Sequence, residues 1–165
     1  MVTFDFELTD EDVRALKTIE ERAIYLLAMR EHGAKEMVCK LNQKFAHLSL
    51  ENLPILVDFV VLKCQENNSL SDERYIESYV RNALKKGQGF YKIKQSLQQK
   101  TDEEDLIVAY LDIGDTEWNL LAKQVLQKKY GDDFKQSTPK EQAKQMRFLQ
   151  SRGFSQEQIW ASLKK

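Results

Sequence analysis

The residues best suited to chemistry lie in one basic window, residues 81–100. The window contains no acidic residue and six basic ones: Arg81, Lys85, Lys86, Lys92, Lys94 and Lys100. The whole chain has a formal net charge of −1, so the residues outside the window sum to −7. A solvent-exposed helix face is the ordinary role of a lysine-rich stretch, but such faces usually mix both signs. Because a local excess of one sign attracts opposite charge, we interpret the window as a surface for an acidic partner.

Gly87-Gln88-Gly89 lies at the centre of the basic window and could belong to a nucleotide loop or to a turn. A dinucleotide fingerprint requires a glycine at position 92, which is Lys92, and a strand before the loop, which the sequence does not predict. Apolar residues recur at helical spacing on both sides: Tyr75, Ile76, Tyr79, Val80, Ala83 and Leu84 before, and Phe90, Ile93 and Leu97 after. We therefore predict a helix–turn–helix elbow whose glycines end the first helix.

Other residues of reactive type do not form a convincing site. His32, His47 and Cys39 lack a fourth ligand or an orienting carboxylate at a suitable spacing. Glu103-Glu104 reads as a helix start, and Asp132-Asp133 as a turn. The sequence therefore predicts no catalytic residue, no metal site, no cofactor and no enzyme activity.

Composition places the chain among water-soluble globular proteins. It has 165 residues, of which 42% are hydrophobic and 31% charged. No apolar run approaches the roughly 20 residues that span a bilayer, and the first residues do not form a secretory signal. We expect a cytoplasmic protein without membrane contact, in which Cys39 and Cys64 are reduced thiols packed on helices.

Helix signals recur along the whole chain and predict an all-α fold, because prolines and glycines are few and alternating β-branched runs are missing. A flexible arm is expected at residues 1–8. Helices are expected at about 9–30, 34–43, 51–66, 71–86, 90–100, 101–114, 115–130, 138–153 and from 155 onward, with a loop at 45–50. Thr9, Thr138 and Ser155 should begin helices, and Ile24, Leu27, Ile159, Trp160 and Leu163 should be buried.

The elbow recurs when Gly33, Gly89 and Ser155 are superposed. Apolar positions then coincide: Ile24, Val80 and Met146; Leu27, Ala83 and Leu149; Met37, Ile93 and Ile159; Leu41, Leu97 and Leu163. Any two amphipathic helices align in this way, but a basic residue also stands three positions before each break, namely Arg30, Lys86 and Arg152. Units this small bury their apolar faces only by stacking. We predict repeat units at about 9–48, 50–100 and 102–165 in an elongated, curved array.

Three stretches, taken in order, resemble the RecX family of bacterial regulators of the RecA recombinase. The first is Leu27-Ala28-Met29-Arg30-Glu31-His32 with Glu36-Met37 and Lys40-Leu41; the second is Ser71-Asp72-Glu73-Arg74-Tyr75 with Lys86-Gly87-Gln88-Gly89, Ile93, Leu97 and Lys100; the third is Lys144, Arg147-Phe148-Leu149, Arg152-Gly153-Phe154-Ser155 and Ile159. The similarity spans about residues 20–163. Gly33 departs from the pattern, because the family commonly has Ser there, and the helix after it is expected to lack its cap.

The resemblance implies a fold of three tandem three-helix repeats that binds along the deep groove of the RecA–DNA filament. It further implies that the protein modulates ATP hydrolysis, strand exchange and SOS coprotease activity of the filament, with inhibition as the expected direction and stimulation left open by the sequence, and so influences DNA repair and recombination. The expected partner- and DNA-binding residues are Arg30, Arg81, Lys85, Lys86, Lys92, Lys94, Lys100, Lys144, Arg147 and Arg152. We expect a monomer that contacts single- or double-stranded DNA weakly or within the filament. A nucleic-acid binder acting without RecA is the alternative, which the near-neutral net charge disfavours.

Overall fold

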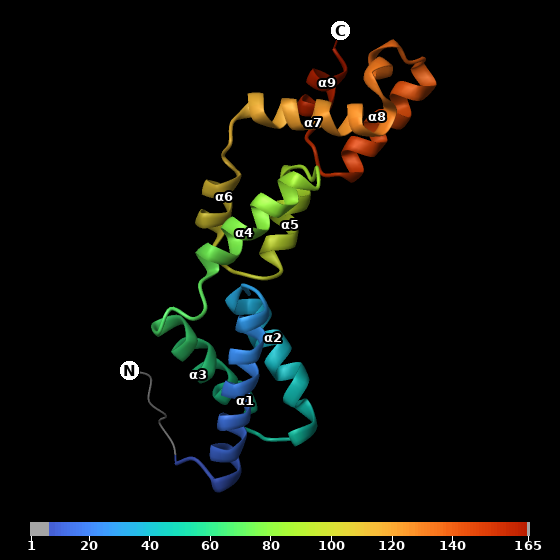
Figure 1. Ribbon diagram of the computed structural model, residues 1–165. Helices are drawn as coiled ribbons and strands as arrows, with labels where there is room; N and C mark the ends of the chain where they lie inside the picture. The colour runs from blue at the N-terminus through green and yellow to red at the C-terminus, as the bar shows by residue number, and fades with distance from the viewer. Residues whose placement is uncertain (1–6, 165) are drawn as a thin grey trace. The chain divides into compact units, whose positions relative to one another are not determined.

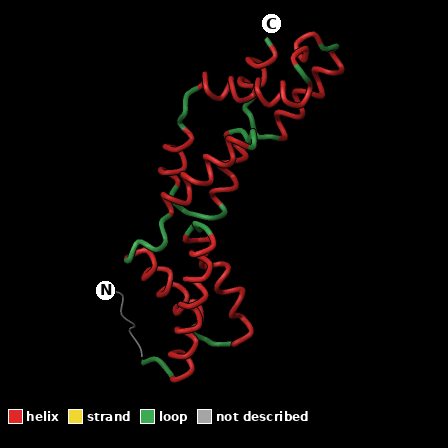
Figure 2. The backbone as a smooth tube through the Cα atoms, in the orientation of Figure 1, coloured by secondary structure: helices red, strands yellow, loops and turns green. Residues whose placement is uncertain are grey.

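The computed structural model describes residues 7–164, and these residues are helical with no strand (Figures 1 and 2). The all-α prediction is confirmed. The predicted flexible arm at 1–8 lies outside the described residues except for Glu7 and Leu8, and Leu8 packs against the first hydrophobic core. None of the helices that the structure describes is long and apolar enough to cross a membrane.

Within residues 7–164 the α-helices follow one another in three consecutive groups of three. Their bounds are α1 (Asp10–Met29), α2 (Ala34–Phe45) and α3 (Leu53–Glu66); α4 (Asp72–Lys85), α5 (Phe90–Gln98) and α6 (Glu104–Leu111); and α7 (Asp115–Tyr130), α8 (Pro139–Ser151) and α9 (Gln156–Leu163). The described part of the chain also contains the short 3-10 helices η1 (Ala46–Leu48) and η2 (Asp132–Gln136). The loop predicted at 45–50 is thus partly helical, and α6 ends earlier than predicted.

By its internal contacts the chain divides into two compact units. The first, hereafter unit 1, runs to Tyr75 and includes Gln99–Glu103; the second, unit 2, comprises Ile76–Gln98 and the residues from Glu104 onward. In unit 1 the helices α1, α2 and α3 pack pairwise around one core. The buried apolar positions of α1 are Ala15, Ile19 and Ala23. Ile24 is 63% exposed, so its predicted burial is wrong: it follows Ala23 on the helix and lies about 100° away from the buried stripe.

In unit 2, α7, α8 and α9 pack pairwise, and α5 packs on α6. The buried side chains of this unit include Ile93, Leu97, Ile107, Leu111, Trp118, Ala122, Leu126, Leu149 and Ile159. Trp118 donates its indole N–H to the carbonyl oxygen of Leu111 at 3.2 Å, which satisfies its polar atom inside the core. Trp160 is 56% exposed, so the prediction that it faces inward is wrong, whereas that for the preceding Ile159 is confirmed.

Three predicted helix starts are confirmed as capping boxes. In each, a hydroxyl oxygen accepts from a backbone N–H three residues on, and the side chain at that later position accepts from the cap backbone: Thr9 with Asp12, Thr138 with Glu141, and Ser155 with Gln158. The carboxyl pKa values of Asp12 and Glu141 are lowered mainly by these bonds from the threonines. These polar pairs fix where α1, α8 and α9 begin.

Helix α2 receives no cap from its own N-cap residue, as expected, and residues distant in sequence take this role. Gly33 offers no side chain, but the N–H of Ala34 donates to Oδ1 of Asp72 at 2.9 Å. The N–H of Glu36 donates to the carbonyl oxygen of Lys100 at 3.0 Å. A Cβ at Gly33 would lie 2.1 Å from that same oxygen, so the close approach requires glycine.

The two cysteines are both free thiols, and they differ in exposure. Cys64 is 7% exposed in the core of unit 1, and burial raises the pKa of its thiol. Cys39 is exposed on α2, so the prediction that it is a packed thiol is wrong.

Candidate functional site

At the predicted elbow, residues 81–100, helix α4 ends in a Schellman motif and α5 follows. The N–H of Gly87 donates to the carbonyl oxygen of Leu84 at 2.9 Å, and that of Gln88 to Ala83 at 3.0 Å. Gly87 has a φ of +67°, which favours glycine. Lys86 therefore occupies the C-cap position, next to the negative end of the α4 dipole.

The same motif ends α8. Here Gly153, with a φ of +88°, donates its N–H to the carbonyl oxygen of Gln150 at 3.0 Å, and Phe154 donates to Leu149 at 3.2 Å. Arg152 holds the C-cap position that Lys86 holds on α4. The basic residue that recurs in the sequence repeat is thus explained, for these two helices, by its place at a helix C-terminus.

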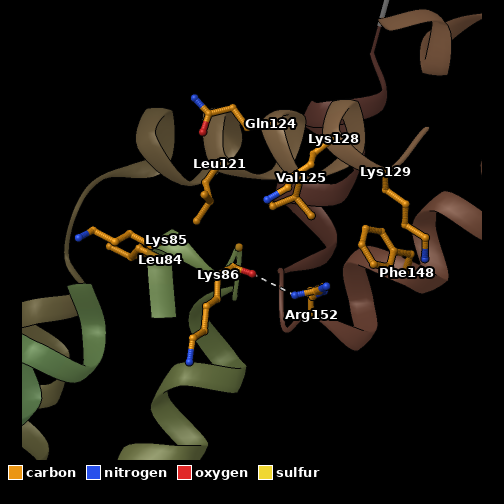
Figure 3. Close-up of a pocket in the computed structure, with 11 residues that line it drawn as sticks. Leu84, Lys85, Lys86, Leu121, Gln124, Val125, Lys128, Lys129, Phe148 and Arg152 are labelled. Atoms are coloured by element: carbon orange, nitrogen blue, oxygen red, sulfur yellow. Dashed lines mark hydrogen bonds between the residues drawn. The ribbon is translucent and has the colours of Figure 1, made fainter. Parts of the chain in front are cut away.

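These two turns are joined by their backbones. The N–H of Gly89 donates to the carbonyl oxygen of Arg152 at 2.7 Å, and the N–H of Tyr91 donates to that of Gly153 at 3.0 Å. The Arg152 guanidinium donates to the carbonyl oxygen of Lys86 at 3.0 Å (Figure 3). A Cβ at Gly89 would lie 2.5 Å from backbone atoms of Gly153, and a Cβ at Gly153 would lie 2.5 Å from the backbone nitrogen of Lys92. The two turns therefore come this close only because both positions are glycine.

A pocket of about 420 Å³ lies beside the joined turns, and we call it the basic pocket (Figure 3). It is lined by residues from three places: Leu84, Lys85, Lys86 and Gly87 at the end of α4; Leu121, Gln124, Val125, Lys128 and Lys129 on α7; and Phe148 and Arg152 at the end of α8. The C-terminal ends of three helices therefore converge on it. All lining residues belong to unit 2.

The charge of the basic pocket is one-sided, because five cations and no carboxylate line it. Among the residues that the structure describes, no ion pair involves Lys85, Lys86, Lys128 or Lys129, and all four side chains are exposed. Three helix C-termini offset part of this charge, at about half a unit of negative charge each. The pocket keeps a net positive charge and is suited to bind an anion.

Phe148 holds two of the five cations in place. The Lys129 ammonium lies 3.7 Å from the ring centroid, and the Arg152 guanidinium carbon lies 5.2 Å from it. Lys129 is also 5.4 Å from the ring centroid of Tyr130. The cations at 129 and 152 are therefore positioned before any ligand arrives, whereas Lys85 and Lys86 extend into solvent.

Two of the predicted partner-binding residues, Arg30 and Lys100, lie instead in unit 1 around a buried carboxylate. Glu36 is 5% exposed, and its carboxylate lies 2.7 Å from Nη2 of Arg30, 3.2 Å from Nζ of Lys40 and 3.7 Å from Nζ of Lys100. Although burial alone would raise the pKa of Glu36, the hydrogen bonds from Arg30 and Lys40 lower it from 4.5 to about 2. We call these four residues the Glu36 cluster.

The other predicted cations lie outside the basic pocket as well. Lys94 forms an ion pair with Glu104 at 2.6 Å, and Arg81 lies 4.0 Å from Glu77. Exposed side chains are found at three further predicted positions, Lys92, Lys144 and Arg147. Of the predicted set, the structure thus brings Lys85, Lys86 and Arg152 together in the basic pocket, and Arg30 and Lys100 together around Glu36. The window that lacks acidic residues in sequence acquires carboxylates from elsewhere.

Lys128 and Lys129 were missed by the sequence reasoning. The signal that could have found them is a lysine pair in the last turn of a helix, followed by Gly131, as Lys85 and Lys86 precede Gly87. Such pairs complement a helix dipole on any surface helix, so the pattern alone does not indicate that two of them share a pocket.

His32, considered above for metal binding, is 1% exposed and has partners on both ring nitrogens. Nδ1 donates to the carbonyl oxygen of Arg30 at 2.9 Å, and Nε2 accepts from the Lys40 ammonium at 3.2 Å. Burial lowers the pKa of His32. Within residues 7–164 no group of three or more His, Cys, Asp or Glu side chains is placed to hold a metal ion.

The sequence matches two family models of RecX. The model for the third three-helix domain matches residues 120–163, and the model for the second three-helix domain matches residues 71–109. A protein named Regulatory protein RecX from Vibrio parahaemolyticus is 40% identical over 140 residues, which cover 85% of this chain and 86% of that one. Its namesake from Yersinia enterocolitica is 33% identical over 153 residues, covering 84% and 91%.

Solved structures share the fold. The crystal structure of RecX from Lactobacillus salivarius superposes with a TM-score of 0.72 at 18% identity, covering 92% of this chain and 96% of that one. A second crystal structure, of a regulatory protein RecX, gives a TM-score of 0.71, also at 18% identity, covering 96% of this chain and 81% of that one. The likeness supports the all-helical fold of three-helix domains.

Proposed function

This chain belongs to the RecX family, and we propose that it binds the RecA–DNA filament and lowers ATP hydrolysis, strand exchange and coprotease activity of the filament. The observation that carries the proposal is the basic pocket, which is lined by five cations and no carboxylate. The relatives are named regulatory proteins, which supports a regulator rather than an enzyme. The protein would act in the cytoplasm, as a monomer.

In this proposal the basic pocket and its rim contact acidic protein surface or DNA within the filament. Lys85, Lys86, Lys128 and Lys129 are exposed and free of ion pairs in the described chain, so an acidic partner could bind them without breaking an existing ion pair. Arg81, Lys92, Lys94, Lys144 and Arg147 stay predictions as outlying contacts. Arg30 and Lys100 are half-exposed but already bound to Glu36, so we expect them to contribute less.

The test is single-strand-DNA-dependent ATP hydrolysis by RecA during titration with this protein. We expect hydrolysis to fall, and we expect a variant with Glu at positions 85, 86, 128 and 129 to leave it unchanged. Because the four side chains are exposed, helicity and melting temperature should stay close to wild type. Full hydrolysis in the presence of several-fold excess of the wild-type chain would refute the proposal.

A matched control carries the same change in charge at other exposed lysines. Lys17, Lys44, Lys140 and Lys164 are exposed, and none lines the basic pocket. Their replacement by Glu should preserve most of the inhibition. Equal loss in the control and in the pocket variant would mean that net charge, and not the pocket, determines filament binding.

The basic pocket also favours a second candidate function, sequence-nonspecific nucleic-acid binding without RecA. Affinity for bare DNA would then fall steeply with salt, because phosphate neutralisation releases counterions. Equal affinity for bare and RecA-coated single-stranded DNA would favour this alternative.

A further inference from the structure

The basic pocket concentrates more positive charge than a single carboxylate can neutralise. Five cations line a space of about 420 Å³. Because like charges at short range repel one another, the pocket is most stable around a compact anion that carries several charges. A chain of linked phosphate groups has this character, and each phosphate offers several strong acceptor oxygens. We propose that the basic pocket binds the phosphate chain of a nucleoside triphosphate.

Two of the five cations are already fixed in position. Phe148 holds the Lys129 ammonium at 3.7 Å and the Arg152 guanidinium carbon at 5.2 Å from its ring centroid. Arg152 is held further by its bond to the carbonyl oxygen of Lys86 at 3.0 Å. Ordering these two side chains costs little when the ligand binds, because they are ordered before it arrives. Lys85, Lys86 and Lys128 can then adjust to the remaining phosphates.

An apolar wall lines one side of the pocket and offers a surface for the nucleoside part of the ligand. Leu84 from α4 and Leu121 and Val125 from α7 form this wall (Figure 3). The wall is tight where Gly87 meets Val125, since a Cβ at Gly87 would lie 2.5 Å from the valine side chain. A base or ribose can lie against these side chains while the phosphates contact the cations. The volume is also in the range of small-ligand pockets, roughly 300–1,000 Å³.

A nucleic-acid strand fits this geometry less well than a nucleotide. Single strands are usually bound in extended basic grooves, with aromatic rings on which successive bases stack. The aromatic side chain that lines the pocket is Phe148, and its ring already contacts Lys129 and Arg152. The concentrated charge without a free stacking ring therefore favours a short phosphate chain. This inference does not rest on the proposed function, because binding is measured with the isolated chain.

The experiment is isothermal titration calorimetry of the full chain at low salt, with four probes: ATP, inorganic tripolyphosphate, adenosine and a short oligothymidylate. We expect ATP and tripolyphosphate to bind, ATP more tightly, and adenosine to give no measurable heat. Affinity should fall as salt rises, since the contacts are ionic.

Variants locate the site. Replacing both Lys128 and Lys129 by Glu should weaken ATP binding by at least about tenfold, because two charge-assisted contacts are lost. The Phe148→Leu variant keeps every charge but removes the ring that orders two cations, and it should weaken ATP binding by a few-fold. The Phe148→Tyr variant keeps an aromatic ring and should bind ATP as tightly as the wild type. Lys17→Glu with Lys44→Glu is the control, since both residues are exposed, belong to unit 1 and do not line the pocket. Circular dichroism confirms that each variant is folded.

Several results would overturn the inference. These are no binding of ATP and tripolyphosphate, equal binding of adenosine and ATP, or equal weakening by the control pair. Binding of the oligothymidylate without ATP or tripolyphosphate would also overturn it and would assign the pocket to a nucleic-acid backbone. A chain that binds ATP but leaves RecA hydrolysis unchanged would uphold this inference while refuting the proposed function.

Discussion

Replacing Glu36 by Gln removes the negative charge around which Arg30, Lys40 and Lys100 gather in unit 1. The Glu36 side chain is 5% exposed, whereas the three cations are 48%, 38% and 40% exposed. The variant keeps the shape of the side chain and a hydrogen-bonding amide. Its effect on stability therefore measures the charge itself.

The lowered pKa of Glu36 gives the size of the expected loss of stability. Its lowering from 4.5 to about 2 corresponds to about 3 kcal/mol of stabilisation of the folded state, at about 1.4 kcal/mol for each pH unit. After the replacement the three cations are exposed enough to regain water, so the loss should be smaller than for a fully buried cluster. We expect Glu36→Gln to lower the free energy of unfolding by about 2–3 kcal/mol at pH 7.

The pH dependence provides a second test of the same interaction. A carboxyl group whose pKa is lower in the folded state stabilises that state above its unfolded pKa, and this contribution is lost as pH falls through the folded pKa. The difference between wild type and Glu36→Gln should therefore be complete at pH 6–7, shrink below pH 4.5 and nearly vanish at pH 2. A difference that persists at pH 2 would contradict a charge-based origin.

Urea unfolding followed by far-UV circular dichroism measures the loss. Trp118 and Trp160 both belong to unit 2, so tryptophan fluorescence reports on that unit, whereas Glu36 lies in unit 1. Glu77→Gln is the matched control, because Glu77 is 55% exposed and lies 4.0 Å from Arg81. The control should change stability by less than about 0.5 kcal/mol. A similarly small effect of Glu36→Gln at pH 7 would refute the reasoning.

Three further replacements test contacts made by the backbone, one of them as a control. Gly153→Ala places a Cβ 2.5 Å from the backbone nitrogen of Lys92 at a φ of +88°, and should cost more than about 2 kcal/mol in urea unfolding. Gly114→Ala has a φ of +86° with nothing within 4 Å, and should cost only about 1–2 kcal/mol; equal losses would contradict the close approach. Asp72→Ala removes the carboxylate that accepts from the N–H of Ala34 and should cost about 1 kcal/mol. Hydrogen exchange at Ala34 should quicken, and unchanged exchange would exclude the cap.

Local signals predicted most helix starts because their causes are local. Thr9 meets Asp12 three residues away, and Thr138 meets Glu141 at the same spacing, so both polar pairs are visible in the sequence. The glycines at 87 and 153 ended helices as expected, since their positive φ is a property of the turn itself. Apolar periodicity predicted the burial of single residues less reliably. Ile24 and Trp160 fit an apolar pattern, but both are exposed and lie beside the buried stripe of their helix.

Contacts between distant residues were not predictable in this way. The basic window lacks acidic residues in sequence, yet three glutamates outside it, Glu36, Glu77 and Glu104, form ion pairs with its cations. Conversely, Lys128 and Lys129 join Lys85 and Lys86 only because α7 and α4 end at the same pocket. The sequence therefore indicated that lysines and arginines form the candidate site. Which of them lie close together could be seen only from the fold.

The discontinuity of unit 1 has a consequence for how the protein is made. Gln99–Glu103 belongs to this unit, although residues 76–98 separate it from the rest. During synthesis on the ribosome, α1, α2 and α3 emerge before Lys100, whose carbonyl oxygen accepts from the N–H of Glu36. They also emerge before Thr101, which is 1% exposed in the finished fold. An N-terminal fragment that stops at Gln98 would stay at that unfinished stage, so dissection of the protein into independently folding pieces must keep the chain through Glu103.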